Sequence, residues 1–113
     1  KNMPGFTPVG PYAVPLAEIA DPYDLWLTCV VNGEQRLRVN TDEYIHRIEG
    51  IIAHFSRFMP FEAGDVIATG APRGTAIGQP NAAELYLKPG DVCVAGLEGV
   101  MEITTHIVAP GEA

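Results

Sequence analysis

A short glycine-rich segment carries the residues best suited to bind an anion. Gly70, Ala71, Pro72, Arg73 and Gly74 follow directly on a run of residues typical of a β-strand. Two glycines around a Pro-Arg pair can expose backbone N–H groups, and the guanidinium adds a planar set of donors that matches a carboxylate. The spacing is therefore compatible with a carboxylate-binding site, although spacing alone favours the plainer interpretation of a tight loop with a solvated arginine.

Other polar residues give weaker chemical signals. Lys1 can polarise an enolate or carboxylate oxygen as a compact positive charge, although by itself it is only a solvated terminal lysine. His46 and His54 are too far apart in sequence for a metal pair on one helical turn, so surface histidines are expected. Ser56 lies outside any GxSxG motif, and the sequence therefore lacks the nucleophile of a serine hydrolase.

The two cysteines and the acidic pair before the predicted helix have ordinary structural explanations. Cys29 and Cys93 lack CxxC spacing and a paired histidine, which argues against a zinc site or a thiol redox motif. We expect both to be small buried apolar residues, and reduced thiols fit a cytoplasmic protein. Asp42 and Glu43 are explained by the favourable interaction of negative charge with a helix N-terminus.

The elements that must position these residues are mostly β-strands. Asn32-Gly33 joins two β-rich runs, 25–31 and 34–39, and predicts a hairpin with a type I′ turn. Apolar residues at helical spacing predict one packed helix over about 41–59, capped by Asn40 or Thr41 and ended by Pro60. Further strands are expected at 12–14, 65–69, 84–87, 92–95 and 101–108. The fold class is mainly β (α+β), a mixed β-roll or barrel with that single helix.

Composition limits the functions that the chain can have. A length of 113 residues corresponds to a single domain, 1–113, and the composition is that of an ordinary globular protein. The net charge of −7, with basic residues scattered along the chain, gives no stripe for nucleic acid. No apolar run approaches the roughly 20 residues that span a bilayer, so no membrane association is expected.

Several segments, taken in order, resemble the fumarylacetoacetate hydrolase family. Lys1-Asn2-Met3-Pro4-Gly5-Phe6 with Pro8 and Gly10-Pro11-Tyr12 is similar to the family segment K-x-x-D-G-F-x-P-x-G-P-W/Y. The stretch 18–22 resembles E-I-x-D-P, and 58–74 resembles F-M-x-x-x-G-D-x-I-x-T-G-T-P-x-G. The closing segment 87–100 is similar to L-K-P-G-D-x-V-x-x-x-I-E-G-I-G. The match covers nearly the whole chain.

The resemblance implies a β-roll fold, a homodimer and a divalent metal, Mg or Mn. The metal would bind a substrate that is a 2-oxo or enol carboxylate. It also implies that Lys1 contacts substrate oxygens as the catalytic residue and that Thr69, Gly70 and Ala71 bind the substrate carboxylate, with Arg73 able to assist. The metal-binding carboxylates of the family lie upstream of the segment that matches Lys1. The chain is therefore expected to be the C-terminal part of a catalytic domain that lacks its metal-binding portion.

Two positions depart from the family pattern. Ala71 stands where the family usually has Thr, whose hydroxyl would hydrogen-bond the carboxylate, a loss of about 0.5 to 1.5 kcal/mol. Pro4 stands where the family has Asp, which removes an acceptor and an amide donor beside Lys1. Backbone N–H groups or Arg73 can compensate for the first departure, and both put the substrate preference in question.

Three functions are consistent with these residues. The first is a metal-dependent hydrolase that cleaves a C–C bond in an acylpyruvate or fumarylacetoacetate-like substrate. The second is an isomerase or decarboxylase of 2-hydroxy-diene-dioates in aromatic catabolism. The third is an inactive fragment or a binding module, an interpretation that Ala71, Pro4 and the absent metal carboxylates favour.

Overall fold

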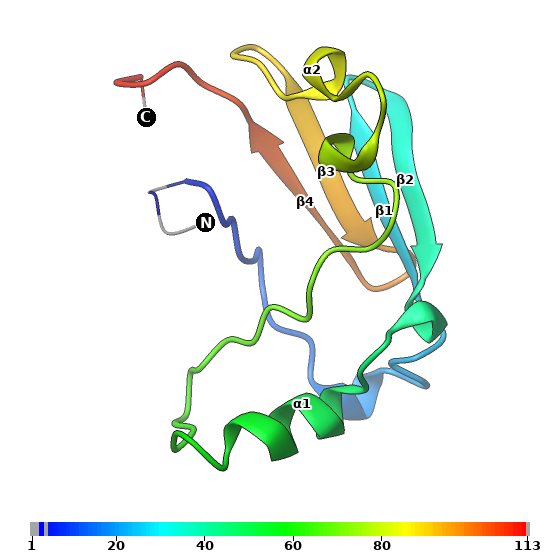
Figure 1. Cartoon of the computed structure of the whole chain (residues 1–113), viewed down its shortest axis with the longest axis vertical. Helices are drawn as coiled ribbons and strands as arrows, with labels where there is room; N and C mark the ends of the chain where they lie inside the picture. Colours follow the sequence, from blue (N-terminus) through cyan, green and yellow to red (C-terminus); the bar gives the residue numbers. More distant parts are fainter. Residues whose placement is uncertain (1–2, 4, 113) are drawn as a thin grey trace.

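A four-stranded antiparallel sheet forms one side of the computed structural model, which describes residue 3 and residues 5–112 (Figure 1). The strands are β1 (Trp26–Val31), β2 (Glu34–Asn40), β3 (Val92–Leu97) and β4 (Met101–His106). Their order across the sheet is β2-β1-β3-β4, and each neighbouring pair is antiparallel. The expected class, mainly β with one main helix, is confirmed.

The hairpin between β1 and β2 has the predicted turn. Asn32 has φ +51° and Gly33 has φ +81°, the pair of positive angles that a type I′ turn requires. The Asn32 side chain also donates to Asp91 Oδ1 at 2.8 Å and accepts from the Val92 backbone N–H at 2.9 Å. The turn residue therefore connects the hairpin to the start of β3, as well as reversing the chain.

The predicted helix over 41–59 is shorter than expected. A 3-10 turn, η2 (Thr41–Glu43), and the α-helix α1 (Ile48–Phe55) are separated by extended backbone at Tyr44 and Arg47. The Asn40 side chain accepts from Asp42 N–H at 3.0 Å and so caps η2 instead of α1. Helix α1 also ends before Pro60, with the chain closing in tight turns after Phe55.

Tyr23 explains where α1 begins. Its hydroxyl accepts a hydrogen bond from the Ile48 backbone N–H at 2.9 Å and donates one to the Glu49 carboxylate. The Arg47 guanidinium lies 4.0 Å from the centre of the Tyr23 ring. This side chain from the lead-in segment satisfies an N–H that the helix leaves open, a role usually taken by a local cap.

Three of the predicted strands are wrong. Residues 12–14 and 65–69 form no strand within the described chain, and 84–87 overlaps a short helix, α2 (Ala82–Leu85). A strand requires a pairing partner, and the segment 65–69 lies apart from the sheet, with Val66 74% exposed. Two further 3-10 turns complete the elements, η1 (Leu16–Glu18) and η3 (Ala76–Gly78).

Much of the apolar surface remains open. Among the described residues only Val31 and Thr41 are buried. The predicted packing of the helix stripe is not met within this part of the chain, because α1 lies away from the sheet in Figure 1 and its apolar side chains Ile52 and Phe55 are exposed. Phe58 and Met59, just after the helix, are exposed as well. No helix of residues 3 and 5–112 has the length and hydrophobicity needed to cross a membrane.

Candidate functional site

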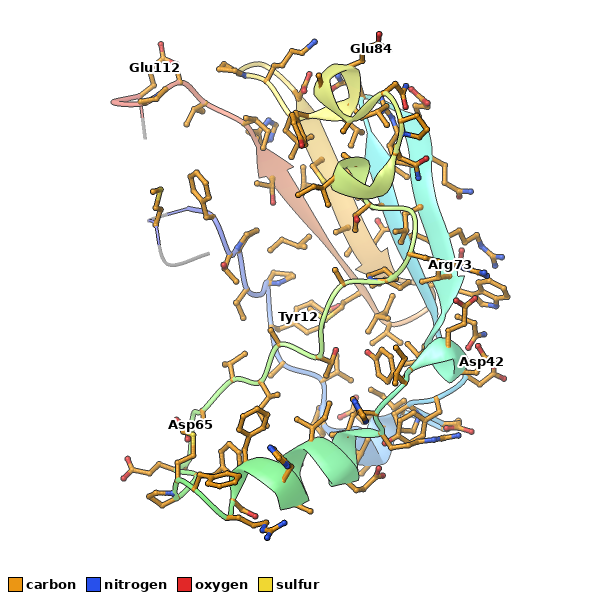
Figure 2. All side chains as sticks on the ribbon, viewed as in Figure 1. Tyr12, Asp42, Asp65, Arg73, Glu84 and Glu112 are labelled. Carbon is orange, nitrogen blue, oxygen red and sulfur yellow. The ribbon has the colours of Figure 1, made fainter. Side chains whose placement is uncertain are left out.

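A cavity of about 580 Å³ lies where the 69–73 segment passes the end of the β1–β2 hairpin. One wall is formed by η2 and the extended residues after it, and the other by the glycine-rich segment. All four predicted substrate-binding residues line it together: Thr69, Gly70, Ala71 and Arg73. Figure 2 shows Arg73 and Asp42 on the same side of the molecule, near the end of the sheet where η2 begins. These residues are neighbours in the chain, and the fold adds the facing wall, which includes Glu43 and Tyr44.

Gly70 sets the direction of the backbone in the 69–73 segment along the cavity. Its φ is +106°, a backbone conformation that side chains of L-residues rarely adopt. A Cβ added there would meet nothing within 4 Å, so the requirement for glycine comes from the backbone angle and not from crowding. The residue can turn the chain while leaving open space beside its backbone.

Thr69 and Tyr44 join the two walls. Their hydroxyl oxygens are 3.1 Å apart, and either can be the donor. Tyr44 also packs edge-on against Tyr23, with ring centroids 6.3 Å apart. Tyr44 falls within the helix predicted over about 41–59. Because the helix starts later, its ring and hydroxyl contribute to the cavity instead.

Arg73 and Glu43 form an ion pair at the cavity. Arg73 Nη2 lies 2.8 Å from Glu43 Oε1, and the two side chains are 79% and 42% exposed. Exposed ion pairs contribute about 0–1 kcal/mol, so a ligand carboxylate can replace Glu43 on the guanidinium at little cost. Glu43 lies in the first turn of η2, as expected for an acidic residue at a helix N-terminus, and this pairing adds a partner that no local sequence signal indicates.

The histidines do not form a metal site. His46 lines the cavity, whereas His54 packs against Phe55 and Phe58 with ring centroids 5.2 and 5.3 Å apart. Within residues 3 and 5–112, no three His, Cys, Asp or Glu side chains come close enough together to hold a metal ion. The residues described therefore do not fit the divalent cation that the family resemblance implies. Lys1 and Pro4 lie outside the described residues.

Hydrogen bonds shift the ionisation of groups around the sheet and helix. The Arg38 guanidinium, which donates to both oxygens of Glu98, lowers the pKa of that carboxyl, and Asn32 does the same for the pKa of Asp91. The Tyr23 hydroxyl lowers the pKa of Glu49, while partial desolvation and this hydrogen bond raise the pKa of Tyr23. These carboxylates are thereby held in their charged form.

Comparison with known proteins gives a family match over most of the chain. Residues 1–108 match the model of the fumarylacetoacetate (FAA) hydrolase C-terminal family. The 4-hydroxyphenylacetate degradation bifunctional isomerase/decarboxylase of Salmonella dublin is 35% identical over 113 residues, which are 100% of this chain and 24% of that protein.

Two solved structures share the fold. A Mycobacterium smegmatis protein assigned as HpcE matches with a TM-score of 0.82 and 35% identity, covering 90% of this chain and 37% of that one. Maleylpyruvate hydrolase from Sphingobium sp. SYK-6 matches with a TM-score of 0.75 and 30% identity, covering 88% and 34%. The chain thus spans between about a quarter and somewhat over a third of the length of these proteins.

Proposed function

The chain belongs to the fumarylacetoacetate hydrolase family, and we propose that it supplies the carboxylate-binding part of an enzyme acting on a 2-oxo or enol carboxylate. The reaction that we propose is cleavage of a C–C bond in an acylpyruvate or a fumarylacetoacetate-like substrate. The observation that carries this proposal is the cavity that the 69–73 segment lines together with Glu43 and Tyr44 of the facing wall.

The chemistry of this cavity favours an anionic substrate. The guanidinium of Arg73 offers two parallel N–H donors to a carboxylate, and its present partner Glu43 is itself a carboxylate. The Thr69 hydroxyl can donate to the substrate while it accepts from Tyr44. Ala71 leaves one hydroxyl fewer than the family pattern, so Arg73 takes a larger share of the carboxylate binding in this proposal.

Lys1 and the metal complete the proposed site. We propose that Lys1 contacts the substrate oxygens, as the family resemblance implies, and stabilises the negative charge that develops there. A divalent cation, Mg or Mn, would supply electrophilic stabilisation of the same oxygens. Since the described residues gather no cluster to hold it, we propose that its ligands belong to a part of the enzyme outside these 113 residues.

An isomerase or decarboxylase is the second candidate function. The similarity to the isomerase/decarboxylase of Salmonella dublin over the whole chain favours it, whereas the likeness to maleylpyruvate hydrolase favours hydrolysis. An inactive or ligand-binding relative is a third candidate, supported by Ala71 and Pro4. The open apolar side chains along α1 and just after it support a homodimer, and the proposed setting is cytoplasmic.

The proposed function is tested on the purified native protein, supplied with magnesium, by following the loss of acylpyruvate ultraviolet absorbance. Intact mass measured on the same sample establishes which polypeptide is present. Metal-dependent loss of absorbance by a protein larger than 12.1 kDa supports the hydrolase. A mass near 12.1 kDa without turnover contradicts activity of this chain by itself, and isomerisation or decarboxylation without hydrolysis supports the second candidate.

A further inference from the structure

Cys29 on β1 and Cys93 on β3 face each other across the two central strands. Their Sγ atoms are 3.6 Å apart, although the residues are 64 positions apart in sequence. In the β1–β3 register, Cys29 is opposite Ala95, and Cys93 is opposite Val31. The two cysteines are therefore diagonal neighbours on one face of the sheet, because side chains two residues apart on a strand share a face.

We propose that Cys29 and Cys93 form a redox-modifiable dithiol, which a low-molecular-weight disulfide converts into an intramolecular disulfide between β1 and β3. This proposal is independent of the reaction proposed for the first cavity. It replaces the sequence-based expectation that both cysteines are small buried apolar residues, since each is only half-buried.

A second cavity gives reagents access to the sulfurs. It has a volume of about 530 Å³ and is lined by both cysteines, by Ala95 and Leu37 beside them on the sheet, and by the loop that begins at Pro72. The loop passes close to the sheet at Gly74, where an added Cβ would lie 3.8 Å from Leu37 Cδ1. The dithiol thus lies on the floor of an open cavity rather than in a sealed core.

The environment of the pair distinguishes the two thiols. Burial raises the pKa of Cys29 to about 11, and the hydrogen bond with Cys93 adds to this effect, while the nearby Arg36 guanidinium opposes it. Cys29 therefore remains a protonated S–H that can donate to the Cys93 sulfur. Cys93 is the sulfur that we expect to attack first.

The exchange balances with one disulfide as the oxidant. The Cys93 thiolate attacks the reagent RSSR, its S–S bond breaks, and one RS⁻ leaves with the Cys93–SR bond formed. Cys29 then loses its proton to solvent or to the departing thiolate and attacks the Cys93 sulfur, releasing the second RS⁻. In total, two protein thiols are oxidised and RSSR is reduced to two RSH.

The diagonal register of the two cysteines leads us to expect a reversible bond. Diagonal positions on antiparallel strands are about 7–8 Å apart at Cα, at or beyond the upper limit that a disulfide spans without movement of the backbone. Strained disulfides are more easily reduced than structural ones. We therefore expect a bond that forms under oxidising conditions and opens again with a mild thiol reductant.

The test uses glutathione disulfide on the purified native protein, followed by alkylation of free thiols and peptide mapping. The expected product joins the peptide with Cys29 to the peptide with Cys93, with the loss of two hydrogens in mass, and dithiothreitol reverses it. Cys29→Ser is expected to stop at a stable glutathione adduct on Cys93. Cys93→Ser is expected to form its adduct more slowly, because burial still raises the pKa of the remaining Cys29 thiol.

A second measurement does not depend on the variants. Phenylarsine oxide bridges two adjacent thiols, and one arsenic is expected to bind across Cys29 and Cys93 in the wild-type protein. The proposal is overturned if both cysteines remain alkylatable after the glutathione disulfide treatment, if each carries a separate adduct, or if the disulfide joins two chains. It is also overturned if phenylarsine oxide does not protect Cys29 and Cys93 together from alkylation.

Discussion

The hydroxyl oxygens of Thr69 and Tyr44 lie 3.1 Å apart, and this contact joins the two segments that enclose the first cavity. Thr69 precedes the glycine that turns the chain, and Tyr44 lies in the extended break between η2 and α1. Loss of this contact should therefore alter the position of the 69–73 segment, which we propose binds the carboxylate.

Tyr44→Phe removes the hydroxyl while keeping the ring that packs against Tyr23. The loss of one hydrogen bond, about 0.5 to 1.5 kcal/mol, should raise the KM for a carboxylate substrate about two- to tenfold and change kcat little. Steady-state kinetics of the native enzyme measure this. Tyr86→Phe, an exposed tyrosine outside the cavity, is the matched control, and equal kinetics for the two variants would contradict the assigned role.

Ala71→Thr introduces the hydroxyl that the family pattern has at this position. If the 69–73 segment holds the substrate carboxylate, the added donor should lower KM by a factor of about two to ten, the value of one hydrogen bond. Ala71→Val adds similar volume without the hydroxyl and serves as the control. An unchanged KM with Thr, or the same change with Val, would show that no carboxylate is bound beside residue 71.

Tyr23→Phe should destabilise the start of α1. The variant lacks the oxygen that accepts from the Ile48 N–H and the hydrogen that is donated to Glu49. Hydrogen exchange at the Ile48 amide should become faster, while exchange within β1 and β3 should change little, because the sheet does not depend on this contact. Unaltered exchange at Ile48 would show that the helix start has another support.

Protonation of two carboxylates should lower the free energy of unfolding at acidic pH. The pKa values of Glu98 and Asp91 are lowered in the folded protein, chiefly by hydrogen bonds from Arg38 and Asn32 respectively. A lowered folded-state pKa stabilises the protein above the unfolded value, about 4, and this contribution is lost as the pH falls through the folded pKa. Urea midpoints measured from about pH 5 downward should therefore decrease, and Glu98→Gln should flatten part of the decrease. A midpoint that stays constant over this window would contradict both assignments.

Features with local causes could be predicted from the sequence, and features with distant causes could not. The Asn32-Gly33 turn carries its own signal, so the hairpin was predicted correctly. The start of α1 depends on Tyr23, which is 25 residues away from Ile48. The apolar periodicity does not indicate this contact. The segment 65–69 has the composition of a strand but no partner within the described chain, so composition alone predicted the wrong structure.

The residues of the candidate site also divide into those with a local sequence signal and those without one. The glycine-rich segment could be proposed from residue types and family resemblance, because Gly70 and Arg73 lie three positions apart in the chain and are chemically distinctive. Glu43 and Tyr44 were assigned to a helix, and their places at the cavity follow only from the break before α1. The approach of Cys29 to Cys93 depends on strand register, which two isolated cysteines do not indicate.

The most direct measurement compares the kinetics of Arg73→Ala and the wild-type native enzyme with an acylpyruvate, and with the amide of the same compound. An ion pair of a guanidinium this exposed is worth about 0–1 kcal/mol, so we predict that Arg73→Ala raises KM for the acid by up to about fivefold. For the amide, the KM of Arg73→Ala should be almost the same as the KM of the wild type. Arg57→Ala, which removes an exposed arginine outside the cavity, is the control. A KM for the acid that is the same in Arg73→Ala and Arg57→Ala would contradict the assignment of the 69–73 segment as the carboxylate seat.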